Sequence, residues 1–225
     1  MLKKYDKNNI LFDWRNFETI LLDMDGTLLD LNFDNYFWQV LIPKIYSKKF
    51  FISEDEAIKN IHSMYAKYQG TLDWYCLEFW SDKLDLDLKE LKYNNRHLIR
   101  FLPGVEKFLD TMKINNKRIV LVTNAHPFAL EIKKSHVQLD KWFEEFISSH
   151  QYGVPKEDQY FWKKLKLQLG FSLKSTLFFD DSITVLDAAR KFRIGGLVAI
   201  REPSSVCLPR NIKEYQSIDG LRSLI

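Results

Sequence analysis

Cysteine is scarce in this 225-residue chain, and long apolar runs are absent. Its two cysteines, Cys76 and Cys207, form no CxxC pair and cannot build a disulfide framework. No apolar stretch approaches the roughly 18 residues that cross a bilayer. Residues 1–6 also lack the apolar run that is typical of a signal peptide. We therefore expect a soluble protein of the reducing cytoplasm, with no membrane partner.

An excess of charge of one sign is lacking as well. The 33 basic and 30 acidic side chains leave a net charge of only +3, too weak a field for a dedicated nucleic-acid binder. A small anionic substrate remains compatible with this balance. Glycine occurs only 8 times, whereas aromatic residues make up 15% of the chain. Because 46% of the residues are hydrophobic, disorder is excluded, and the length suits one core domain with an insertion.

Short apolar runs recur along the chain and predict buried strands at 19–22, 118–122, 145–147, 176–179 and 196–200. Apolar residues at helical spacing lie between the later runs, at 105–112, 161–169 and 183–190. Strands that alternate with helices indicate a parallel sheet of the α/β class.

Residues 31–100 break this alternation, because strand signals vanish and helix signals follow one another. The helix-start signals are Asp34, the pair Ser53 and Glu56, and the pair Asp87 and Glu90. Pro43 is expected to end or kink the first of these helices. We predict an all-helical insertion at 31–100 between the first and second strands, in a core formed by 1–30 and 101–225.

Two pairs of aspartates follow predicted strands. Asp23 and Asp25 come directly after the first strand, two residues apart on an extended chain, and so can project to the same side. Asp180 and Asp181 follow the strand at 176–179, where adjacent like charges are costly unless a cation neutralises them. A simple turn and a helix cap are the alternatives for the two pairs. Two clusters at two strand ends favour phosphoryl transfer with a bound Mg²⁺.

Three further polar residues suit the same chemistry. Thr123 and Asn124 follow the second strand and offer a hydroxyl and an amide to phosphate oxygens, although turn residues look alike. Lys156 can neutralise a transferring phosphate, although most lysines lie on the surface. The order of these residues along the chain favours the catalytic interpretation.

In these residues the chain resembles the haloacid dehalogenase-like (HAD) superfamily of hydrolases, with all four of its motifs in order. The resemblance implies a Rossmann-like parallel core with a helical cap, and the aspartate at 25 favours phosphate-ester hydrolysis over dehalogenation. It implies Asp23 as nucleophile and Asp25 as acid and base. It also implies Mg²⁺ held by Asp23, the backbone carbonyl of Asp25, Asp180 and Asp181, with Thr123 and Lys156 on the phosphoryl oxygens.

The insertion is rich in aromatic residues, with 14 in 70 positions against 19 in the other 155. Such rings either fill a small helical core or stack on a purine base. Together with Thr-Asn-Ala-His-Pro at 123–127 and Pro-Lys-Glu-Asp-Gln at 155–159, the insertion resembles bacterial GMP/IMP nucleotidases. That resemblance implies hydrolysis of purine 5′-monophosphates. The candidate substrate contacts are Asn35, Trp38, Trp74 and His126.

Two other functions stay open on the sequence. One is a sugar-phosphate phosphatase or phosphomutase of the same superfamily, which would keep both aspartates. The other is a nucleotide-binding regulatory module that has kept the fold without turnover. A comparison of phosphate release from several esters separates all three.

Overall fold

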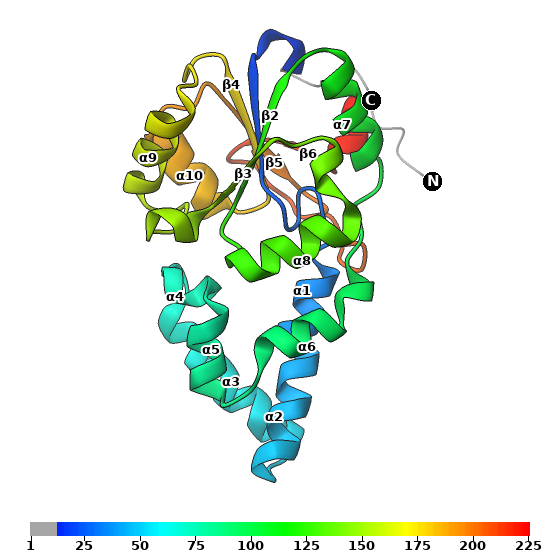
Figure 1. Ribbon diagram of the computed structural model, residues 1–225, viewed down its shortest axis with the longest axis vertical. Coiled ribbons are helices and arrows are strands. Elements are labelled where there is room, and N and C mark those ends of the chain that lie inside the picture. Colours follow the sequence, from blue (N-terminus) through cyan, green and yellow to red (C-terminus); the bar gives the residue numbers. More distant parts are fainter. Residues whose placement is uncertain (1–12) are drawn as a thin grey trace.

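A computed structural model describes residues 13–225 and contains a six-stranded parallel sheet (Figure 1). The strand order is β3-β2-β1-β4-β5-β6. The strands are β1 (Thr19–Leu22), β2 (Arg118–Thr123), β3 (Glu145–Ser148), β4 (Thr176–Asp180), β5 (Gly196–Ile200) and β6 (Gln216–Ile218). The five predicted strands are confirmed. Strand β6 was not predicted, because its three residues contain only one apolar side chain.

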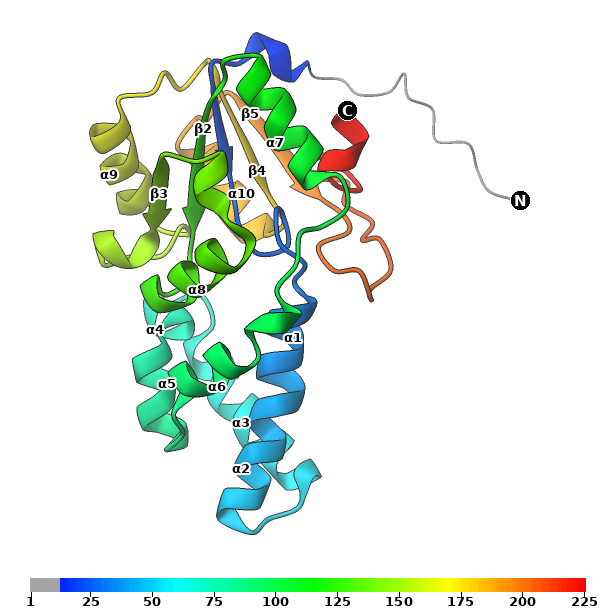
Figure 2. The ribbon, with the colours of Figure 1, turned by 45° about the vertical axis from the view of Figure 1, so that its right-hand side comes forward.

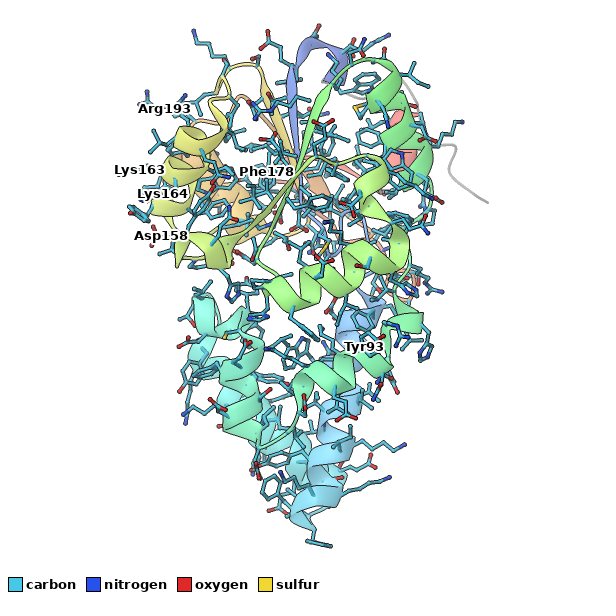
Figure 3. The ribbon with its side chains drawn as sticks, viewed as in Figure 1. Tyr93, Asp158, Lys163, Lys164, Phe178 and Arg193 are labelled. Carbon is cyan, nitrogen blue, oxygen red and sulfur yellow. The ribbon has the colours of Figure 1, made fainter. Side chains whose placement is uncertain are left out.

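Helices cover both faces of the sheet. The four are α7 (Val105–Ile114), α8 (Pro127–Val137), α9 (Gln159–Leu169) and α10 (Ile183–Lys191). Alternate residues of β1 separate the two layers: Ile20 and Leu22 pack with α7 and α8, and Leu21 packs with α9 and α10. In Figure 3, Phe178 of β4 lies on the inner side of α9. The predicted α/β class with a parallel sheet is therefore confirmed.

Between β1 and α7 the chain forms a helical lobe, the cap, which extends from one end of the sheet (Figure 2). Its helices are α1 (Asn32–Tyr36), α2 (Ile42–Phe50), α3 (Glu54–Tyr68), α4 (Leu72–Tyr75), α5 (Leu77–Leu84) and α6 (Leu88–Asn94). Residues 32–98, all described by the structure, include no strand, as predicted. The division of the chain at 31 and 100 stays a prediction.

Two predicted caps start helices of this lobe. The backbone N–H of Glu56 donates to Ser53 Oγ at 3.2 Å, and that of Glu90 donates to Asp87 Oδ1 at 2.9 Å. Each contact satisfies one of the donors that a helix start leaves unpaired.

Pro43 does not end the first cap helix. That helix begins at Asn32 and continues through a π-helical turn, Phe37–Leu41, into α2, which carries Pro43 in its first turn. The N–H of Ile42 donates to the carbonyl of Phe37, five residues back, in this wider turn. A wider turn relieves the clash between a proline ring and the preceding turn, so the helix is distorted and not broken.

The two connections between core and cap run side by side. Leu29 and Phe101 form an antiparallel bridge, and the N–H of Asp30 donates to the carbonyl of Arg100 at 2.9 Å. The buried Asp30 carboxylate also accepts from the Arg100 guanidinium at 2.9 Å. The cap is thus anchored to the core at the base of both connections.

Cys76 and Cys207 are both free thiols. Over residues 13–225, no helix has the length and apolar character required to cross a membrane.

Candidate active site

Three carboxylates meet at the carboxyl end of the sheet. Asp23 follows β1, Asp180 ends β4 and Asp181 follows it, so the parallel pairing of β1 with β4 brings them together. One carboxylate oxygen from each lies within 4.8 Å of the others. Such oxygen donors suit Mg²⁺, and the three acids outnumber their two nearby cations, Lys156 and Arg210, so that an excess of negative charge remains for a bound cation to offset.

Burial dominates the protonation of this carboxylate cluster. It raises the pKa of Asp23 to about 7, with the Asp180 carboxylate adding to the rise and Lys156 opposing it. Burial likewise raises the pKa of Asp180 to about 6 and that of Asp181 to about 7. A cation among the three groups would favour their charged forms. The cluster is therefore electrostatically suited to a metal.

Lys156 is the buried cation of this cluster. Its Nζ lies 2.5 Å from Asp23 Oδ1 and 2.7 Å from Asp180 Oδ2, and it also donates to the carbonyl of Val122 at 3.2 Å. Burial disfavours the ammonium, but Asp180 and Asp23 outweigh it and raise the pKa of Lys156. The side chain is only 2% exposed and stays charged.

Asn124 positions the loop that carries this lysine. Its Oδ1 accepts from the backbone N–H of Lys156 at 2.8 Å, and its Nδ2 donates to Glu157 Oε2 at 3.0 Å. The other Glu157 oxygen accepts from the hydroxyl of Tyr75, a cap residue, at 2.8 Å. Both ends of the Asn124 amide are thus engaged within the protein, and its contact with phosphate stays a prediction. Thr123, the residue before Asn124, is also buried and lines a cavity between the core and the cap.

Asp25 pairs with a lysine other than the one in the three-carboxylate cluster. Its Oδ1 accepts from Lys133 Nζ of α8 at 2.7 Å. Gly26 follows with φ +86°, and a Cβ at this position would lie 2.8 Å from the Cγ of Asp181. Only glycine fits this turn, in which the backbone passes close to the Asp181 side chain.

A cavity of about 720 Å³ lies between these groups and the cap. All four predicted substrate contacts line it: Asn35, Trp38, Trp74 and His126. The rings of Trp38 and Trp74 each pack edge-on against Tyr65, at centroid distances of 5.9 and 5.4 Å. Core and cap therefore share one cavity that is lined by carboxylates on the core side and by aromatic rings on the cap side.

His126 joins the core to the cap at the edge of this cavity. Its Nε2 lies 2.6 Å from Glu78 Oε2 of α5, and burial lowers its pKa although Glu78 opposes that shift. His150 is half-buried and packs edge-on against the His126 ring at 5.0 Å. His62, on α3 of the cap, lines the cavity too.

Several residues at the site carried no recognisable sequence signal. Lys92 and Lys133 occur in helices, where lysine ordinarily faces water, yet both are buried beside the cavity. Arg210 comes from the loop before β6 and donates to the carbonyls of Asp181 and Ile200, at 2.6 Å each. Only the tertiary fold brings these cations to the aspartates.

The raised pKa values predict how pH affects the metal-free protein. The pKa values of Asp23 and Asp181 are about 7 in the folded protein, above the value of about 4 in the unfolded chain. Between these two values the folded state binds more protons than the unfolded state. The contribution of the cluster to stability therefore falls as pH rises from 4 through 7. Asp181→Asn removes one such group. In EDTA we expect the variant to gain stability relative to the parent as pH rises, at up to about 1.4 kcal/mol per pH unit.

Urea denaturation at pH 5, 6, 7 and 8 measures this difference. Asp110→Asn, the same change at an exposed position of α7 that does not line the cavity, is the control. A constant difference for Asp181→Asn would contradict the raised pKa. Saturating Mg²⁺ should reverse the trend in the parent protein, because the metal binds the charged form.

Known proteins match this chain over most of its length. A family model described as haloacid dehalogenase-like hydrolase matches residues 17–193. A GMP/IMP nucleotidase, YrfG, from Escherichia coli (strain K12) is 39% identical over 214 residues, which cover 94% of this chain and 96% of that protein. The protein of the same name from Shigella flexneri matches to the same extent.

Solved structures share the fold. A HAD phosphatase from Thermococcus onnurineus superposes with a TM-score of 0.76 at 22% identity, over 92% of this chain and 95% of that one. An L-2-haloacid dehalogenase from Xanthobacter autotrophicus gives a TM-score of 0.62 at 13% identity, over 92% and 96%. At sequence identities this low, the similarity to these two structures shows a shared fold and nothing more.

Proposed function

This chain belongs to the haloacid dehalogenase-like hydrolases, and from that premise we propose that it hydrolyses purine nucleoside 5′-monophosphates, GMP and IMP above all. One observation carries the proposal: a single cavity is lined both by Asp23 and Lys156 and by the cap rings of Trp38 and Trp74. The first pair suits a phosphate group and the second suits a flat base. The nucleotidase relatives support both the phosphatase activity and the purine substrate.

In the proposed reaction a carboxylate oxygen of Asp23 attacks phosphorus, and the bond from phosphorus to the 5′ oxygen breaks. Asp25 gives its proton to that oxygen, so the nucleoside leaves as an alcohol and Asp23 carries an aspartyl phosphate. Asp25 then takes a proton from the water that attacks this acyl phosphate. Phosphate leaves, and both aspartates return to their starting forms.

Lys156 offsets negative charge throughout these steps, because its ammonium lies 2.5 Å from the attacking carboxylate. Thr123 presents its hydroxyl to the phosphoryl oxygens, and Asn124 holds the lysine loop in place. Asp23, the carbonyl of Asp25, Asp180 and Asp181 are the groups that would hold Mg²⁺. When bound, Mg²⁺ polarises the phosphoryl group and keeps the carboxylates ionised.

A phosphate-release panel tests the proposal. GMP, IMP, AMP, several sugar phosphates and p-nitrophenyl phosphate are each assayed with Mg²⁺ and with EDTA. We expect GMP and IMP to give the highest kcat/KM and EDTA to abolish release. Higher values for sugar phosphates would overturn the purine assignment, and nucleotide binding without turnover would indicate a regulatory module.

The cap rings give a second test. Trp74→Leu removes a ring that lines the cavity, so we expect KM for IMP to rise about tenfold, the loss of one base-stacking contact. KM for p-nitrophenyl phosphate, which has no purine, should change less.

Phe79→Leu is the matched control, because Phe79 and Trp74 both pack edge-on against Trp80 but Phe79 does not line the cavity. Steady-state kinetics on both variants measure the difference. Equal effects of the two changes on KM would show that the rings serve only to pack the cap.

A further inference from the structure

Two buried lysines, Lys92 and Lys133, take no part in the reaction as described so far. Each is at most 3% exposed, and both line the cavity. Neither contacts the carboxylate cluster around Lys156. A buried lysine is costly unless its charge is matched, so their partners show what they do.

The two lysines belong to one chain of four alternating charges. Lys92 Nζ donates to Asp34 Oδ1 at 2.8 Å, and Lys133 Nζ donates to Asp34 Oδ2 at 2.6 Å. Lys133 also donates to Asp25 Oδ1 at 2.7 Å. The chain thus runs from α6 through α1 and α8 to the second aspartate of the motif, and its formal charges sum to zero.

Surrounding contacts hold these four charged side chains in one arrangement. The Lys92 ammonium lies 4.2 Å from the centre of the Phe37 ring and 4.8 Å from that of Phe33, and Lys133 lies 5.4 Å from the Phe33 ring. The two lysines lower the pKa of Asp34 to about 2 although burial opposes them. Asp34 is therefore a fixed anion on which Lys133 is anchored.

Stability alone is a weak reason for such a chain, because apolar side chains of similar size would fill the same space at lower cost. What distinguishes it is its end, Asp25, the proposed acid and base of the reaction. Without Lys133 the Asp25 carboxyl would lose the ammonium that donates to it and become free to rotate. General acid catalysis requires the proton donor within hydrogen-bond reach of the leaving oxygen.

We propose that Lys133, anchored by Asp34 and Lys92 of the cap, is a positioning residue that holds Asp25 in place to protonate the leaving oxygen. This rests on the proposed phosphatase mechanism but not on the purine preference. Loss of this positioning should slow the hydrolysis of some esters more than that of others. An alkyl leaving group such as the ribose 5′ oxygen needs the proton as its bond to phosphorus breaks, whereas p-nitrophenolate is a weak base and leaves without it.

Leaving-group dependence tests the proposal. For Lys133→Met we expect kcat/KM for IMP to fall about 100-fold, the lower range for the loss of general acid catalysis. The value for p-nitrophenyl phosphate should fall less than about fivefold, because kcat/KM reports the steps up to the first irreversible one. Lys134→Met, the neighbouring change on α8, removes a lysine outside the cavity and should leave both values unchanged.

Three results would overturn the role. Equal losses for the alkyl and aryl esters would indicate a purely structural contribution. A rise in KM for IMP with kcat unchanged would indicate that Lys133 binds substrate directly. Unchanged kinetics for both esters would show that Asp25 needs no positioning.

A second variant keeps the test independent of folding. Lys133→Met leaves two aspartates facing one lysine, so the double change Lys133→Met with Asp34→Asn removes one charge of each sign. The same selective loss is expected from it. If IMP proves not to be a substrate, any alkyl monophosphate that the parent hydrolyses replaces it, so failure of the purine assignment and failure of the Lys133 role give different results.

Discussion

Replacement of Asp23 by asparagine is expected to reduce kcat by about 10⁴-fold or more, the range found when a nucleophile of a catalytic set is removed. The amide has the same shape but cannot form an acyl phosphate. We expect phosphate release to disappear for alkyl and aryl esters alike, because both require the same attack. This separates Asp23 from Lys133, whose loss spares the aryl ester.

The fold of Asp23→Asn should remain intact. Lys156 keeps its contacts with Asp180 and with the carbonyl of Val122, so the lysine is still paired. Circular dichroism and thermal unfolding measure this, with Asp110→Asn as a control of equal chemistry far from the cavity. Full activity in a folded Asp23→Asn protein would show that Asp23 is not the nucleophile.

Lys156→Met has the second largest expected effect and acts on both activity and stability. Loss of the ammonium removes charge stabilisation from the transferring phosphoryl group, and we expect kcat to fall by about 10²- to 10³-fold. It also leaves the buried Asp23 and Asp180 facing each other without their cation. Breaking such a buried pair costs about 3–5 kcal/mol of stability.

Mg²⁺ separates this explanation from simple misfolding. Because the metal supplies positive charge to the same carboxylates, we expect Mg²⁺ to raise the Tm of Lys156→Met more than that of the parent. Lys117→Met, at the amino end of β2, provides a partly buried lysine control that should show no extra response. An equal Mg²⁺ response in all three proteins would contradict the electrostatic role of Lys156.

The sequence predicted the parts of the site that adjoin strands. Asp23, Thr123 and Asp180 each stand at the end of a short apolar run, and the carboxyl ends of parallel strands must meet. Lys156 follows no such run, and its place at the site came from the order of the motifs and the family resemblance. Its geometry depends on Asn124, whose amide fixes the loop through contacts between residues far apart in sequence.

The rest required the three-dimensional structure. Helix α8 was not predicted from the sequence. Its buried side carries Lys133, which lines the cavity and interrupts the apolar spacing that is typical of a buried helix face. A count of the aromatic residues in the cap also could not show which rings are fully buried and which remain partly exposed. Trp80 is almost fully buried, whereas Trp38 and Trp74 are only partly buried, although all three line the cavity and belong to one cluster of rings.

The pairing of β1 determines the order in which this protein can assemble. Thr19 of β1 lies opposite Arg118 on one side and Thr176 on the other, so neither neighbouring strand exists until about half and then about four-fifths of the chain has been synthesised. Contacts of such long sequence separation slow folding, whereas cap helices form from local ones. On the ribosome, the segment bearing Asp23 must therefore wait, unpaired, for its partners, and the site cannot assemble before β4 has been synthesised.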